Sequence, residues 1–148
     1  MGKRRSSREL AVQALCHLDV NGGDAEEAVR LVNLHFGSKR GLEQFAGELV
    51  AGVTGNAAEI DGFIKEASRH WRLERMPSVD RNILKVAVFE MGWREDIPPR
   101  VSIDEAVEIG KIYGGENSPS FINGVLDRIL TTLADSGRLT GLQASDDG

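Results

Sequence analysis

The residues best suited to do chemistry are concentrated at the N-terminus, where four cations and no acid fall within residues 1–8. Lys3, Arg4, Arg5 and Arg8 give this segment a charge of +4, whereas the other 14 basic and 23 acidic residues sum to −9. A basic segment that runs into a helix start suits phosphate, because free N–H groups and the positive end of the helix dipole add to its charge. No aromatic residue is interleaved for base stacking, so such a segment would grip a nucleic-acid backbone. A frayed, solubilising terminus is the alternative that charge alone leaves open.

Signatures of catalysis and of metal binding are missing from the sequence. It holds no GxxxxGK phosphate loop, no GxGxxG after a strand and no GxSxG elbow. The three histidines are scattered and form no HxxxH pair. We therefore predict that the chain is not an enzyme and binds neither a metal nor a cofactor.

Glu90 is the one unusual carboxylate, because it lies within the apolar run from Val86 to Met91. A buried glutamate of this kind could be a general acid with a raised pKa. The preferred interpretation is structural: Glu90 accepts hydrogen bonds from a helix end or loop and so fixes a joint between two helical halves.

Composition places the chain among ordinary globular domains, with 41% hydrophobic, 28% charged and only 5% aromatic residues in 148. The single cysteine, Cys16, excludes an intrachain disulfide and favours a reducing compartment. No apolar stretch approaches the roughly 20 residues of a membrane-spanning helix, and residues 9–20 are too polar for a signal peptide. These observations predict a cytoplasmic protein.

Apolar residues recur with the helical period of 3.6, and the period of 2 typical of strands is nearly absent. Cap-like residues such as Ser6, Asp24 and Ser102, each followed by an acid three places on, mark helix starts. Gly124 interrupts the pattern and predicts a close approach between helices. The sequence thus predicts an all-α fold with helices at about 6–21, 24–37, 41–54, 56–72, 78–95, 102–113 and 118–136.

We expect one helical domain over residues 1–137, with a basic arm at 1–8 and a joint near residues 71–78. Residues 138–148 are rich in Gly, Asp and other polar residues, which predicts a disordered tail.

Three segments together carry a family resemblance that covers residues 4–130. The first reads RRSSRELAVQAL from Arg4, and the second reads WRLERMPSVDRNILK from Trp71 and continues to Glu90-Met91. The third contains VSIDEAVE from Val101 and FINGVLD from Phe121. In this order and spacing they closely resemble the bacterial transcription antitermination factor family NusB.

The resemblance implies a compact fold of two packed three-helix bundles without catalysis. It also implies binding of the boxA element of nascent RNA, as in ribosomal RNA operons. The partner would be the ribosomal protein NusE, within an antitermination complex on RNA polymerase.

The resemblance further assigns candidate site residues. The RNA-binding residues would be Lys3, Arg4, Arg5, Arg8, Asn117 and Ser118. The partner-binding residues would be Glu74, Asp80, Asn117 and Phe121. A purely structural role stays open for two of them, since Asp80 also suits a helix dipole and Phe121 also suits a core.

Two positions depart from the family pattern: Cys16 stands where many members have Tyr, and Asn117 where many have Asp.

Two other classes of function also stay open. One is an RNA-binding accessory module of a ribosomal RNA methyltransferase-like protein, and the other is a helical DNA-binding regulator. The sequence is compatible with a monomer and with a homodimer.

Overall fold

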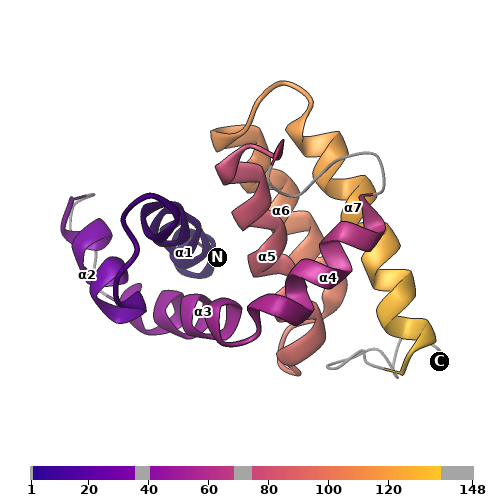
Figure 1. Cartoon of the computed structure of the whole chain (residues 1–148), viewed down its shortest axis with the longest axis horizontal. Helices are drawn as coiled ribbons and strands as arrows, with labels where there is room; N and C mark the ends of the chain where they lie inside the picture. The colour runs from indigo at the N-terminus through magenta and orange to yellow at the C-terminus, as the bar shows by residue number, and fades with distance from the viewer. Residues whose placement is uncertain (1, 36–40, 69–74, 138–148) are drawn as a thin grey trace.

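The computed structural model describes residues 2–35, 41–68 and 75–137, and within these ranges it contains seven α-helices and no strand. The predicted all-α class is therefore confirmed (Figure 1). The helices are α1 (Gly2–Asn21), α2 (Ala25–His35), α3 (Glu43–Gly55), α4 (Ala57–Ala67), α5 (Ser78–Trp93), α6 (Pro99–Tyr113) and α7 (Ser118–Asp135).

The helices form two groups that meet along α1, α3 and α5. Helices α1, α2 and α3 pack on one another, and α4, α6 and α7 surround α5. Figure 1 shows the first group on one side and the second on the other, with the start of α1 on the side that faces α5 and α6. One core of buried apolar side chains runs through both groups.

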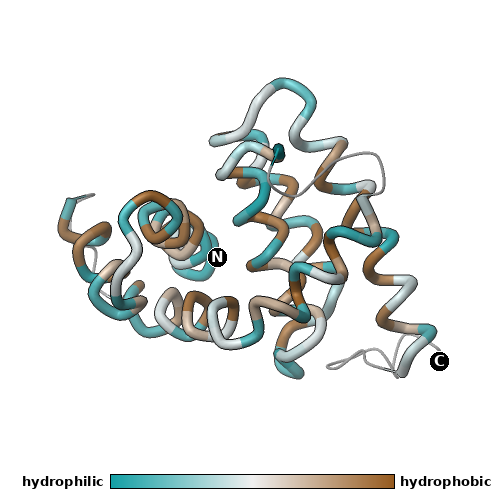
Figure 2. Tube along the Cα trace, viewed as in Figure 1, coloured by the Kyte–Doolittle hydropathy of each residue, from teal (hydrophilic) through white to brown (hydrophobic). Residues whose placement is uncertain are grey.

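Helix α5 is the central element of the fold. From Asn82 to Gly92 every residue except Lys85 is buried, as expected of a helix surrounded by others. The other helices carry hydrophobic residues between hydrophilic ones along their length, so each has an apolar stripe to bury (Figure 2). None of the helices in the described part of the chain is long and apolar enough to cross a membrane.

Several predicted helix ends agree with the structure, and two differ in a way that bears on function. Asp24 caps α2, since its carboxylate accepts a hydrogen bond of 2.9 Å from the Glu27 N–H. The predictions that Ser6 and Ser102 are caps were wrong. Helix α1 already begins at Gly2, and α6 begins at Pro99, where a proline costs no helical hydrogen bond.

The predicted basic arm is therefore the first two turns of a helix. Part of the predicted joint (residues 71–74) and the whole predicted tail (residues 138–148) lie outside the described residues.

The close approach expected at Gly124 occurs at Gly52 instead. Gly124 is exposed, and a Cβ placed there would meet nothing within 4 Å. A Cβ at Gly52 would overlap the ring of Phe89, which stacks on Trp93 with 5.9 Å between ring centroids. Gly52 thus allows α3 to lie against α5, which is one of the contacts between the two groups.

These two glycines give a matched pair of stability predictions. Gly124→Ala should raise the free energy of unfolding by about 0.5–1 kcal/mol, because alanine favours an exposed helix interior. Gly52→Ala should lower it by about 1–3 kcal/mol, because the methyl group forces the Phe89 ring to move. Urea unfolding followed by circular dichroism measures both, and equal effects of the two substitutions would contradict the assigned contact.

Candidate nucleic-acid interface

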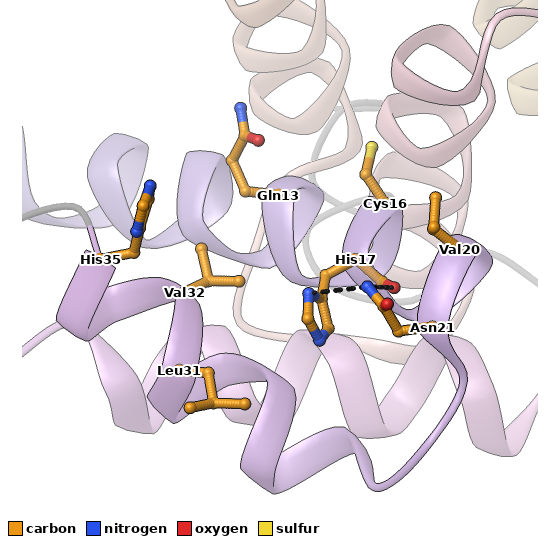
Figure 3. A pocket seen from close by; sticks show the side chains of 8 residues that line it. All are labelled: Gln13, Cys16, His17, Val20, Asn21, Leu31, Val32 and His35. Atoms are coloured by element: carbon orange, nitrogen blue, oxygen red, sulfur yellow. Dashed lines mark hydrogen bonds between the residues drawn. The ribbon is translucent and has the colours of Figure 1, made fainter.

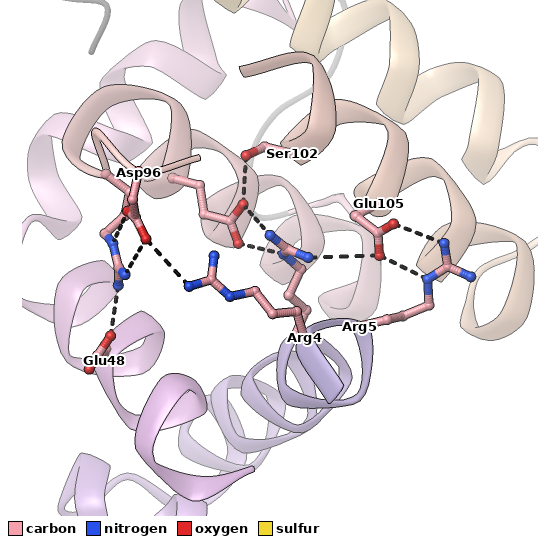
Figure 4. Close-up of polar contacts among 9 residues, drawn as sticks. Arg4, Arg5, Glu48, Asp96, Ser102 and Glu105 are labelled. Atoms are coloured by element: carbon pink, nitrogen blue, oxygen red, sulfur yellow. Dashed lines mark hydrogen bonds and ion pairs between the residues drawn. The ribbon is translucent and has the colours of Figure 1, made fainter. Parts of the chain in front are cut away.

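The four N-terminal cations all lie in the first two turns of α1, where the helix sends them in different directions. Arg4 and Arg8 are four residues apart and share one face, whereas Arg5 is rotated by about 100° from Arg4. Arg4 and Arg5 reach from the start of α1 toward acids of the second group (Figure 4). These orientations divide the four cations into one buried residue and three accessible ones.

Arg8 is the buried residue, with only 4% of its surface exposed. Its guanidinium donates to both oxygens of Glu90, with 2.7 Å between Nε and Oε2 and 3.1 Å between Nη2 and Oε1. Glu90 is fully buried and also accepts a hydrogen bond of 2.6 Å from the Ser102 hydroxyl. This network ties α1 to α5 and α6, so Glu90 fixes the junction as expected, with side-chain donors in place of a helix end or loop.

The burial of Arg8 argues against the direct contact with RNA that the resemblance assigned to it. A guanidinium that donates to Glu90 inside the protein has no face left toward solvent, so the sequence pattern overestimated the available charge by one. The structure also argues against Glu90 as a general acid, because both of its oxygens accept hydrogen bonds within the core.

Arg5 is accessible but strongly paired. Its guanidinium donates two hydrogen bonds of 2.8 Å to the carboxylate of Glu105 on α6, and 36% of its side chain is exposed. The hydrogen bonds from Arg5 lower the pKa of Glu105, although desolvation opposes this, and the pKa of Arg5 is raised by the same contact. Both groups stay ionised at neutral pH. The part of Arg5 that solvent can reach therefore belongs to an ion pair, not to a free cation.

Arg4 is the most exposed of the three arginines in the first two turns of α1, with 51% of its side chain accessible. It lies 3.4 Å from Asp96, a carboxylate that Arg94 contacts more closely at 3.0 and 3.1 Å. Arg94 also donates a bond of 2.8 Å to Glu48. The hydrogen bonds from Arg94 are the main reason that the pKa of Asp96 falls to about 2.

Phe45 of α3 is the ring around which these cations gather. The guanidinium carbons of Arg4, Arg94 and Arg8 lie 4.4, 5.3 and 5.6 Å from its centroid, within the range of cation–π attraction. Sequence reasoning missed both Phe45 and Arg94, since neither is near the basic segment in the chain. A cation at the end of the helix predicted over 78–95 was the only available signal for Arg94.

The accessible cations thus form a surface that we call the α1 basic face: Lys3, Arg4 and Arg5 with Arg94 beside them. Within the described ranges Lys3 is exposed and makes no ion pair, whereas each arginine contacts an acid. The face is consequently less positive than the sequence suggested.

A second region, a groove of about 440 Å³, lies where α5 begins and the α6–α7 connection turns. It brings together four residues that were predicted to bind RNA or a partner. Glu74, the remaining predicted partner contact, lies outside the described residues. The groove is lined by Arg75, Met76, Pro77, Asp80, Gly115, Glu116, Asn117, Ser118 and Phe121.

Asp80 and Ser118 form the buried side of this groove, which argues against the direct contacts with a partner and with RNA that the resemblance assigned to them. They are only 5% and 6% exposed, and the Ser118 hydroxyl donates to the Asp80 carboxylate at 2.8 and 2.9 Å from its two oxygens. The same hydroxyl accepts a bond of 2.9 Å from the Gly115 N–H. The pair therefore holds the α6–α7 connection, and Asn117, exposed, and Phe121, half-buried, remain accessible in the groove.

A further groove of about 620 Å³ separates α1 from α2 and contains none of the predicted site residues (Figure 3). Cys16 lines it and accepts a long contact of 3.6 Å from the Asn82 amide. His17 and His35 also line it, yet no three metal-ligating side chains come together anywhere in the described ranges.

The chain was compared with protein families and with known proteins. The model of the NusB family matches residues 5–131. A relative from Desulforapulum autotrophicum, named transcription antitermination protein NusB, is 49% identical over 131 residues, which cover 87% of this chain and 92% of that protein. A relative of the same name from Geotalea uraniireducens is 45% identical over 143 residues, or 91% and 99% of the two chains. The chain belongs to the NusB family.

Solved structures of the NusB family agree with this assignment. NusB of T. maritima is 36% identical and superposes with a TM-score of 0.78, covering 86% of this chain and 90% of that one. A crystal structure of the antitermination factors NusB and NusE in complex with dsRNA contains a chain that is 27% identical, with a TM-score of 0.79 and coverage of 89% and 98%. NusB proteins are antitermination factors, so the prediction that the chain is not an enzyme is also confirmed.

The buried pair gives a direct test of how α1 is held. Arg8→Met should lower the free energy of unfolding by about 3–5 kcal/mol, because it leaves the Glu90 carboxylate buried without a counter-charge. Arg8→Met combined with Glu90→Leu should recover much of that loss. Urea unfolding measures each variant.

The control for this test is Arg100→Met, which breaks an exposed pair with Asp127 whose side chains are 62% and 47% accessible. It should change the free energy of unfolding by less than about 1 kcal/mol. A loss for Arg8→Met as small as that of the control would show that the pair does not anchor α1.

Proposed function

We propose that this NusB-family protein binds boxA-type RNA of nascent transcripts, such as those of ribosomal RNA operons, together with NusE. The two would act within an antitermination complex on RNA polymerase, in the cytoplasm. The observation that carries the proposal is the similarity to NusB proteins over about nine-tenths of the chain, one of them solved with NusE and RNA, combined with the α1 basic face.

The RNA contacts assigned in this proposal are those that solvent can reach. Lys3, Arg4 and Arg5 would bind phosphates of the RNA backbone, since guanidinium and ammonium groups are the usual donors to phosphate. Arg8 and Ser118 would act indirectly, by fixing α1 and the α6–α7 connection. Asn117 is exposed at the start of α7 and would add a neutral contact.

The groove between α5 and the α6–α7 connection would receive NusE. Pro77, which is exposed, and Phe121, which is half-buried, supply apolar surface there, and Asn117 and Glu116 supply polar surface around it. Outside residues 1–8 the chain carries a net charge of −9, which favours association with a basic ribosomal protein.

The salt dependence of RNA binding tests the assigned RNA surface. Binding of a boxA-like single-stranded RNA is followed by fluorescence anisotropy with and without NusE. The logarithm of the binding constant should fall with the logarithm of the salt concentration, with a slope of about −0.7 per phosphate contact. Three accessible cations predict a slope near −2, and Lys3→Gln combined with Arg4→Gln should flatten it by about 1.4.

Arg100→Gln provides the control, because Arg100 is an exposed arginine outside the α1 basic face. It should leave the slope close to that of the unmodified protein. An unchanged slope in the Lys3→Gln/Arg4→Gln variant would move the RNA site elsewhere, and an absence of RNA binding by the unmodified protein with NusE would refute the proposed function.

A further inference from the structure

The carboxylate of Asp96 lies between two guanidinium groups of the α1 basic face. Arg94 donates to its two oxygens at 3.0 and 3.1 Å, and Arg4 approaches one of these oxygens at 3.4 Å (Figure 4). Arginine binds carboxylates and phosphates in the same way, through parallel N–H groups directed at two oxygens. Asp96 therefore occupies a position that a phosphate oxygen pair would also suit.

The two sides of this contact differ in how firmly they are held. Arg94 is only 21% exposed and remains fixed by Glu48 at 2.8 Å and by the Phe45 ring at 5.3 Å. Asp96 is 48% exposed and lies in the connection between α5 and α6 rather than in a helix. Displacing the carboxylate would thus leave the arginine in place and open a cationic site.

Asp96 would also compete with a phosphate for Arg4 and Arg94 at every physiological pH. Its pKa near 2 means that the carboxylate stays charged across the physiological range of pH, so protonation does not remove it. A phosphate that binds here must replace the Asp96 contact or tolerate its negative charge.

We propose that Asp96 is an internal substitute for RNA phosphate, which occupies the site between Arg4 and Arg94 and is displaced when RNA binds. This inference rests on the proposed RNA-binding function. It adds Arg94 to the phosphate-binding residues, and it makes Asp96 the residue that sets how tightly the α1 basic face holds RNA.

The test is Asp96→Asn, which keeps the size of the side chain and removes its charge. The variant should bind the boxA-like single-stranded RNA about two- to fivefold more tightly, in line with the strength of an exposed ion pair. Its salt slope should stay close to that of the unmodified protein, because Arg94 contacts a phosphate in both complexes once Asp96 is displaced. A purely structural role for Asp96 would produce no gain in affinity.

Asp127→Asn is the matched control, because it also removes one exposed acid from an arginine pair, at Arg100. Equal gains in the two variants would reduce the effect to net charge and overturn the proposal. A second comparison places Asp96→Asn in the Arg4→Gln/Arg94→Gln background. There the gain should vanish, and a gain that persists would also overturn the proposal.

Failure of this inference is distinguishable from failure of the proposed function. If the unmodified protein binds RNA and the Lys3→Gln/Arg4→Gln variant has the flatter salt slope, while Asp96→Asn equals its control, only the role of Asp96 is refuted. If the unmodified protein binds no RNA with NusE present, both proposals are overturned.

Discussion

Arg8 reaches from α1 into the junction of the two helical groups, where Glu90 of α5 neutralises it and Ser102 of α6 completes the network. A buried ion pair contributes little net stability relative to apolar packing, because desolvation of both charges offsets their attraction. Breaking it is costly, however, so it strongly disfavours any other orientation of α1. The direction in which the first turns of α1 point is therefore set by this one interaction.

The consequences extend to the surface. With Arg8 directed inward, Arg4 lies one turn away at the rim, and Arg5 is rotated onto α6. Each of these arginines meets an acid of the second group, so the same contacts that hold α1 also reduce its positive charge. Two requirements therefore oppose each other in the α1 basic face. Folding uses the arginines in ion pairs within the protein, whereas RNA binding needs them accessible to phosphate.

Much of the fold could be predicted because it depends on local signals. The helical period, the Asp24 cap and the breaking prolines lie in the sequence, and they located all seven helices of the described ranges. Which arginine is buried could not be predicted, because Arg4, Arg5 and Arg8 are identical in type and only the packing of α1 against α5 separates them. For the same reason the burial of Asp80 could not be predicted, because it depends on the contact with Ser118 at the start of α7.

The most direct test of this account is amide hydrogen exchange at Ser6, Ser7 and Arg8 in the free protein, followed by NMR. Their helical acceptors are the carbonyl groups of Gly2, Lys3 and Arg4 in the first turn of α1. If the buried pair fixes the start of α1, the three amides should be protected well beyond the rate of an unstructured peptide. Exchange at the unstructured rate would contradict the account, because the cations would then belong to a frayed arm and not to a preformed face.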